Sequence, residues 1–454
     1  MINKILTPIL LIMQLATQAQ FPANGIRSTF VLQNQRENIK TSLHLVTIYQ
    51  TFTLPLNKET EYRYQSAFWS ISQFMVYNDT VVGGFRKTMK AYNDSLDVET
   101  RRSFLEAMHT VQPPGFTEQM IIISKKEKNP KLYAMIQLWL FNMQPKLRPK
   151  IIEAVEERYK QNISSDLMEE LVIYMKDYTK KRVYPPIQDL FAFQHQFGQK
   201  TVYSFQQWNR DFPGIAVIQY EDGHFARDKQ GKLITIQQLA RSASSLPYFI
   251  TNGNTPQGFY RISGIDTSHN NFIGPTPNLQ LIMPNEYYCK DFFLPEADTT
   301  DQLAAYRELF PESWKDYYPV YESFQAGKIG RSEIIAHGTT IDPGFFSGKP
   351  YYPISPTLGC LCAREIWDPV TGGLKESDQL KLANAFMHTS SSTGYMFVIN
   401  YFNKSRPLTV EDIEPLIKAF EIGLLAGPIT PQQNNAKKWS NSDRLNSMIE
   451  TGME

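Results

Sequence analysis

Residues 334–365 read IIAHGTTIDPGFFSGKPYYPISPTLGCLCARE and contain the features on which the predicted fold and function depend. His337 begins a His-Gly pair, and Cys360 ends a Gly-Cys pair farther along the chain. The residues between them are rich in Gly, Pro and aromatics, which is typical of a loop with short strands. Such a loop can fold back and bring the thiol to the imidazole. Because an adjacent imidazole lowers the pKa of a thiol and yields a thiolate, the pair predicts nucleophilic catalysis.

The chain on both sides of this stretch predicts a mostly β region from about residue 210 to 402. Short apolar runs alternate there with Asn, Gly and Pro, which favours strands separated by turns. The runs are FPGIAVIQYEDGHF, KLITIQQL, LPYFIT, GFYRISGI, NLQLIMP and GYMFVINYF. Two helices are expected as well: SDQLKLANAF with Ser377 as its N-cap, and VEDIEPLIKAFEIG after Thr409.

The preceding residues predict helices. The runs ETRRSFLEAMHTV, NPKLYAMIQLWLFNM, RPKIIEAVEERYKQ and SSDLMEELVIYMKDYTKK carry apolar residues at spacings of three and four. Asp166 is expected to cap the last helix, with Glu169 reaching back to its start. These units favour either a stacked array of helical hairpins or an irregular helical domain. The predicted fold is therefore α+β, with a helical domain at 20–205, a mostly β domain at 206–430 and a polar tail at 431–454.

Composition and the N-terminal residues restrict the class of protein. A chain of 454 residues is long enough for two or more domains. With 46 basic and 45 acidic residues, the net charge of +1 gives no electrostatic case for a nucleic-acid partner or an anionic membrane surface. Residues 1–19 have a short positive start, an apolar run and small residues before a cleavage site after Ala19, which predicts a signal peptide. We therefore expect an exported protein without a membrane span.

The cysteines also indicate a reactive thiol. An exported protein with only Cys289, Cys360 and Cys362 has no disulfide framework, and an odd number leaves at least one thiol free. Cys289 and Cys362 are expected to be inert. A zinc site from Cys360, Cys362 and His337 is possible by ligand type, but the spacing differs from CxxC and no fourth ligand is evident. No metal and no other cofactor is therefore predicted.

Three runs of the β region together resemble the L,D-transpeptidases, which have a YkuD-type catalytic domain. The runs are Thr255-Pro256-Gln257-Gly258 followed by Phe259-Tyr260-Arg261-Ile262, then His337-Gly338-Thr339, and finally Thr357-Leu358-Gly359-Cys360-Leu361. The resemblance covers roughly residues 210–402 and does not extend to the helical half. It implies a sandwich-like catalytic domain in which His337 takes the proton of Cys360.

The chemistry that the resemblance implies is acyl transfer within peptidoglycan, which places the protein in the periplasm. The thiolate would attack a diamino-acid–D-alanine bond of a stem peptide, release D-alanine and form a thioester. An amine of a neighbouring stem or of a wall-attached protein would then resolve it. The alternatives are a thiol amidase or carboxypeptidase that uses water, and a catalytically degenerate wall-binding scaffold.

The same resemblance assigns roles to residues around the pair. Backbone N–H groups from Leu358 to Cys360 would stabilise the oxyanion, with Gly359 allowing a tight turn and Thr357 hydrogen-bonding near the pair. Two positions depart from the family pattern, because Leu358 replaces a His and Cys362 replaces an Arg or Asn. Arg364 would take over part of the role of the Arg or Asn that Cys362 replaces. The predicted substrate-binding residues are Tyr260, Gly338, Leu358 and Arg364.

Several other titratable residues of the β region are weaker candidates. Asp266 and Glu286 flank predicted strands and could orient a basic group of the acyl donor. His388 could approach the site from the end of the Ser377 helix. His224 and His269 follow turn or loop residues and are expected to be solvated.

Overall fold

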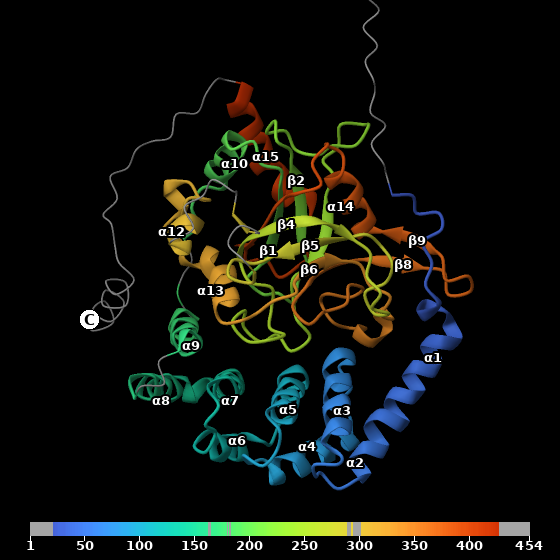
Figure 1. Ribbon diagram of the computed structural model, residues 1–454, viewed down its shortest axis with the longest axis vertical. Helices are drawn as coiled ribbons and strands as arrows, with labels where there is room; N and C mark the ends of the chain where they lie inside the picture. The colour runs from blue at the N-terminus through green and yellow to red at the C-terminus, as the bar shows by residue number, and fades with distance from the viewer. Residues whose placement is uncertain are drawn as a thin grey trace, which may run out of the picture.

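The computed structural model describes residues 21–161, 165–178, 180, 183–287, 292–293 and 301–425. A curved layer of helices lies beneath a compact sheet domain that carries its own covering helices (Figure 1). This arrangement confirms the mixed helix-and-strand fold with a helical N-terminal region. The predicted signal peptide, the predicted tail and Cys289 lie outside the described residues. Within the described part of the chain, no helix is long and apolar enough to cross a membrane.

The N-terminal region consists of consecutive helices. They are η1 (Thr29–Val31), α1 (Gln33–Ser42), η2 (Leu43–Gln50), α2 (Thr51–Thr53), α3 (Glu61–Phe74), α4 (Asp79–Ala91), α5 (Val98–Val111), α6 (Thr117–Ser124), α7 (Pro130–Met143), η3 (Pro145–Leu147), α8 (Arg148–Lys160) and α9 (Asp166–Asp177). Helix α3 packs on α5, α5 on α7, and α7 on α9. Helices α3, α5, α7 and α9 therefore form a row in which each helix contacts the next, as in a stacked array of helical hairpins.

All four helical runs identified in the sequence form helices, because each has an apolar stripe to bury. The cap of α9 differs from the expectation. The Ser165 hydroxyl, rather than the Asp166 carboxylate, accepts the hydrogen bond from Met168 N–H at 3.3 Å. Asp166 is the first helical residue and forms an ion pair with Lys328 at 2.8 Å. It therefore ties α9 to the sheet domain.

Eight strands form one closed, barrel-like sheet in the order β1-β10-β4-β5-β6-β7-β3-β2. Their bounds are β1 (Thr201–Gln207), β2 (Gly214–Gln219), β3 (Ile236–Leu239), β4 (Gly258–Asp266), β5 (Asn278–Ile282), β6 (Ile335–His337), β7 (Leu361–Ala363) and β10 (Gly394–Phe402). A separate two-stranded sheet contains β8 (Glu365–Trp367) and β9 (Leu374–Ser377). The predicted sandwich is not confirmed, because the strands close on one another instead of forming two facing sheets.

The sheet domain begins earlier than the sequence indicated. Strand β1 begins at Thr201, within the last residues of the range assigned to helices, and it pairs in parallel with β10 and antiparallel with β2. The run LPYFIT forms turns instead of a strand. The other helices are α10 (Ile187–Gln196), α12 (Gln302–Arg307), η4 (Glu312–Trp314), η5 (Tyr318–Tyr321), α13 (Glu322–Lys328), η6 (Pro343–Phe346), α14 (Asp378–Phe386) and α15 (Val410–Leu425). Ser377 caps α14 as predicted, accepting from Leu380 N–H at 2.8 Å.

Two hydrophobic cores meet at the strands, because successive side chains point to opposite faces. Phe259 of β4 belongs to the core beneath α10 and α15. The next residue, Tyr260, belongs to the larger core that continues into the helical array. This shared core and several direct contacts fix the array against the sheet domain. For example, the Phe74 ring lies 4.7 Å from that of Phe345, and Lys131 Nζ donates to Thr251 Oγ1 at 2.9 Å.

Candidate functional site

The two residues of the predicted catalytic pair lie on neighbouring strands. Strands β6 and β7 run parallel, with Ala336 opposite Leu361 and His337 opposite Cys362. Cys360 directly precedes β7, and His337 ends β6. The loop between them therefore folds back, so that β7 pairs with the preceding strand β6, as expected. The register, however, places Cys362 rather than Cys360 directly beside His337.

A tight turn positions Cys360. Gly359 has φ +121°, and its N–H donates to Thr357 Oγ1 at 3.0 Å. The Thr357 hydroxyl in turn donates to the carbonyl oxygen of Cys360 at 2.8 Å. The hydroxyl of Thr255, from the TPQG run, donates to the Gly359 carbonyl oxygen at 2.8 Å. Thr357 thus holds the turn, and the Gly359 N–H is engaged there instead of facing an oxyanion.

The Cys360 side chain is half-buried and lines a cavity of about 570 Å³ outside β4, β5 and β6. Its Sγ lies 3.7 Å from the carbonyl oxygen of Glu333, at the approach to β6. Asp266, His269 and Glu286 line the same cavity. Asp266 and Glu286, which the sequence marked as weaker candidates, therefore share a cavity with the thiol. His269 is exposed as expected, but it also belongs to this cavity.

The electrostatics of Cys360 differ from the expectation. Burial raises the pKa of its thiol to about 11, although the Ile335 N–H and the positive charge of Arg331 act in the opposite direction. The imidazole therefore does not produce a resting thiolate. Arg331 is buried and was not identified from the sequence. Its guanidinium donates to the carbonyl oxygens of Asn254 at 2.8 Å and of Gly253 at 3.1 Å, directly behind the turn.

The raised pKa of Cys360 predicts how its alkylation depends on pH. In a Cys289→Ser background, the rate of reaction with iodoacetamide is expected to rise about tenfold per pH unit from pH 7 to 10, because only the thiolate reacts. Mass spectrometry of the Cys360 peptide measures this rate. A Cys362→Ala variant serves as control, since that buried thiol has a pKa raised far above its usual value. A rate that levels off below pH 8 would contradict the assignment.

The His337 imidazole is buried and neutral. Its Nδ1 is hydrogen-bonded to the carbonyl oxygen of Gly338, so Nδ1 carries the hydrogen and Nε2 keeps its lone pair. Burial lowers the pKa of the imidazole to about 4. The ring is therefore uncharged at neutral pH. Within the described residues no hydrogen bond joins it to Cys360 Sγ, which points to Glu333.

A buried carboxylate beside Gly338 and Thr339 is another feature that the sequence did not reveal. Glu365 accepts hydrogen bonds from Thr339 N–H at 2.9 Å and from Ser377 Oγ at 2.7 Å. A Cβ on Gly338 would lie 2.1 Å from the Glu365 carboxyl carbon. Gly338 therefore makes room for this carboxylate, and its role in contacting substrate stays a prediction. No motif marks Glu365, because only the pairing of β8 with β9 brings it here.

Glu365 should make stability depend on pH. Burial raises the pKa of its carboxyl to about 7 in the folded protein, from 4.5. Between these values the folded state holds a proton that the unfolded state releases, so the contribution of this group to stability falls as pH rises. Glu365→Gln is therefore expected to gain stability relative to wild type from pH 5 to 7, by up to ~1.4 kcal/mol per pH unit. Urea unfolding at both pH values, with Glu376→Gln as an exposed control, measures this change; equal differences at both would contradict it.

The remaining predicted residues have other surroundings. Tyr260 is fully buried and its hydroxyl donates to the Pro256 carbonyl oxygen at 2.7 Å, so it does not line the cavity. The Arg364 guanidinium forms an ion pair with Glu376 at 2.9 Å, which occupies the group expected to bind substrate. Leu358 is half-buried on the Cys360 turn.

Two further possibilities concern a third histidine and a metal. The His388 ring packs 5.7 Å from the Tyr220 ring, which follows β2, and is not among the residues lining the Cys360 cavity. Within the described residues, no group of three or more His, Cys, Asp or Glu side chains is arranged to hold a metal ion.

Comparison with known proteins adds no relative. The sequence matches no protein-family model and no curated protein, and the chain matches no solved structure. The resemblance to the L,D-transpeptidases therefore remains a prediction that rests on the three motifs.

Proposed function

We propose that the protein is a periplasmic cysteine acyltransferase of the L,D-transpeptidase kind, acting on peptidoglycan stem peptides. The observation that carries the proposal is the position of Cys360. Its thiol lines a cavity at the start of β7, next to the parallel strand that ends in His337. A half-buried thiol on a tight turn, beside a strand that ends in a neutral imidazole, is a combination typical of nucleophilic catalysis.

The arrangement favours general-base activation over a preformed ion pair. With the pKa of the thiol raised and that of the imidazole lowered, both groups are neutral at pH 7. In the proposed reaction Sγ turns from the Glu333 carbonyl toward His337 Nε2, which removes the thiol proton as sulfur attacks the substrate carbonyl. The N–H groups of Leu358 and Cys360 would face the oxyanion, since that of Gly359 is bonded to Thr357.

The proposed reaction then proceeds in two transfers. The imidazolium returns its proton to the leaving D-alanine nitrogen as the carbon–nitrogen bond breaks, and a thioester remains on Cys360. An incoming amine loses a proton to His337, attacks the thioester and restores the thiol. Asp266, Glu286 and Glu333 give the cavity an acidic lining, which favours a donor peptide with a positively charged amino group.

A degenerate scaffold is the second candidate. It is favoured by the register that places Cys362 beside His337 and by the bond of Cys360 to Glu333. A carboxypeptidase would use the same residues with water as the acceptor.

The experiment that separates these functions follows D-alanine release and dimer formation by mass spectrometry on tetrapeptide muropeptides. Release with cross-linked dimers supports transpeptidation, and release without dimers indicates hydrolysis. Binding to sacculi without turnover by the folded wild-type protein would favour the scaffold.

A further inference from the structure

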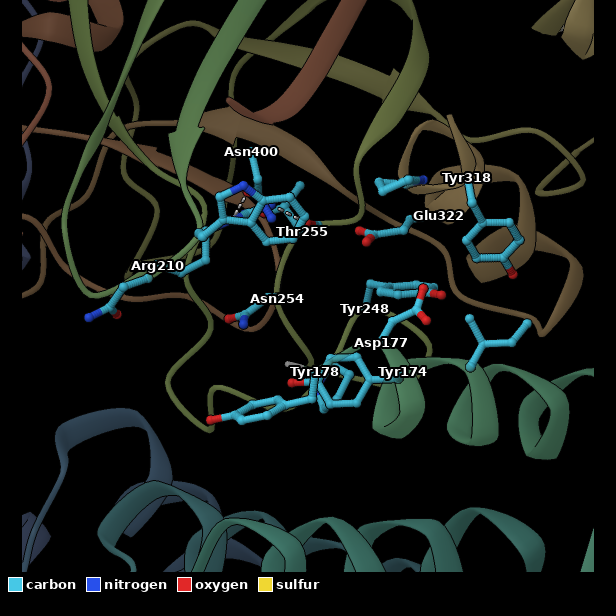
Figure 2. Close-up of a pocket in the computed structure, with 15 residues that line it drawn as sticks. Tyr174, Asp177, Tyr178, Arg210, Tyr248, Asn254, Thr255, Tyr318, Glu322 and Asn400 are labelled. Carbon is cyan, nitrogen blue, oxygen red and sulfur yellow. Dashed lines mark hydrogen bonds between the residues drawn. The ribbon is translucent and has the colours of Figure 1, made fainter. Parts of the chain in front are cut away.

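A second cavity, of about 580 Å³, lies between the helical array and the end of the sheet domain (Figure 2). Tyr174 and Asp177 of α9, together with Tyr178 directly after the helix, form one wall. Arg210, Thr255 and Asn400 belong to the opposite wall, which the sheet domain provides. The volume lies within the range of roughly 300–1,000 Å³ that is usual for small-molecule sites. Neither the thiol nor the imidazole of the proposed catalytic pair lines it.

Aromatic side chains form much of this cavity and are held in place from behind. The hydroxyls of Tyr248 and Tyr318 both donate to the buried carboxylate of Glu170. Tyr178 is 46% exposed, and its ring packs against Arg148, whose guanidinium carbon lies 4.5 Å from the ring centre. These contacts fix the ring planes before any ligand arrives.

Polar side chains line the cavity together with the aromatic rings. Arg210 Nε donates to Asn400 Oδ1 at 2.6 Å. Glu322 accepts from the backbone N–H and the side-chain amide of Gln257 at 2.9 and 2.7 Å. In Figure 2 the Glu322 carboxylate lies in the space between these walls. Arg210 also donates to the carbonyl oxygens of Ala240 and Thr255 at 2.7 and 3.2 Å, so these bonds hold the polar wall in place. Because a carboxylate oxygen can accept more than one hydrogen bond, Glu322 can also accept from a ligand.

We propose that this cavity binds a short neutral oligosaccharide. Aromatic faces stack on the C–H faces of pyranose rings, whereas carboxylate, amide and guanidinium groups each pair with neighbouring sugar hydroxyls. An organic cation would use the same aromatic rings with Asp177 and Glu322, so its binding is tested separately. A highly anionic ligand would meet Asp177 and Glu322.

The cavity is structurally connected to the thiol turn. Thr255 lines it and donates to the carbonyl oxygen of Gly359, the residue before Cys360. A glycan held here would therefore be anchored next to the proposed acyl-transfer site. The inference goes beyond the proposed function and does not depend on it, since saccharide binding requires no reaction at Cys360.

Titration calorimetry on the full chain tests the inference, with the β-1,4-linked trimer of N-acetylglucosamine and with maltotriose as probes. We expect saturable binding of at least one trisaccharide. Tyr178→Ala should weaken it at least tenfold, and Tyr178→Phe, which keeps the ring, should restore most of the affinity. Tyr77→Ala, at an exposed tyrosine outside the cavity, should bind as wild type does. Cys360→Ala should also bind normally, which keeps this result separate from any failure of turnover.

Three outcomes would overturn the proposal. One is no saturable binding of either trisaccharide by a folded wild-type protein. Another is an equal loss of affinity in Tyr178→Ala and Tyr77→Ala. The third is saturable binding of tetramethylammonium that depends on Tyr178 while neither sugar binds, which would assign the cavity to a cation. Circular dichroism of each variant confirms that the fold is intact.

Discussion

Replacing Cys360 with alanine is expected to lower D-alanine release from tetrapeptide muropeptides by at least ~10³-fold, because the variant lacks the nucleophile. Cys362 cannot substitute for it, since that side chain is fully buried in the larger hydrophobic core. Cys362→Ala is therefore the matched control and is expected to retain turnover. Release of D-alanine at the wild-type rate by Cys360→Ala would contradict the assignment of the nucleophile.

The base should be tested on the same substrate. His337→Gln is expected to lower the rate by about 10²–10⁴-fold, because the neutral thiol then has no acceptor for its proton. His269→Gln provides the comparison, since this exposed histidine lines the Cys360 cavity without belonging to the proposed pair. If His269→Gln lost more activity than His337→Gln, His269 rather than His337 would accept the thiol proton, and the proposed pair would be wrong.

Replacing Gly359 with alanine should produce the largest loss of stability at the site. The backbone φ of +121° disfavours any residue with a Cβ. A Cβ would also lie 2.4 Å from Arg331 Nη2 and 2.9 Å from the Gly253 carbonyl oxygen. Backbone strain of about 1–3 kcal/mol and overpacking of about 1–3 kcal/mol together predict a loss of roughly 2–6 kcal/mol in the free energy of unfolding.

A second glycine separates the two causes of this loss. Gly348 also has a positive φ, of +80°, but a Cβ there would meet no atom within 4 Å. Gly348→Ala should therefore lose only the strain component and keep activity. Urea unfolding of both variants measures the difference. Equal losses would show that the contact with Arg331 contributes nothing to stability.

Much of the local structure could be predicted because it depends on neighbouring residues. The run GYMFVINYF forms β10, and the Ser377 hydroxyl caps α14. Both signals are local, since side-chain alternation and hydroxyl capping require only a few consecutive residues. The return of the chain from His337 to Cys360 was also predictable from the glycines and prolines between them. The closure of eight strands into one sheet was not, because strand order is set by pairings between distant segments.

The environment of the site also depends on contacts between segments that are far apart in the sequence. The family motif suggested that Tyr260 contacts substrate. Because successive side chains of β4 point to opposite faces of the sheet, the Tyr260 side chain instead points into the larger core. No motif marks Arg331, which lies behind the Cys360 turn, or Glu365, which lies beside Gly338 and Thr339. Burial of the thiol reversed the expected shift in the pKa of Cys360, although the charge of Arg331 acts in the opposite direction.

The sequence by itself determined the helical and β halves, the turn at Gly359 and the candidate thiol and imidazole, because these follow from residue type and local spacing. Only the tertiary structure decided that the thiol is protonated, that Cys362 is paired with His337, and that an aromatic cavity adjoins the Cys360 turn. Each of these depends on desolvation or strand register, which arise when segments far apart in the chain pack together.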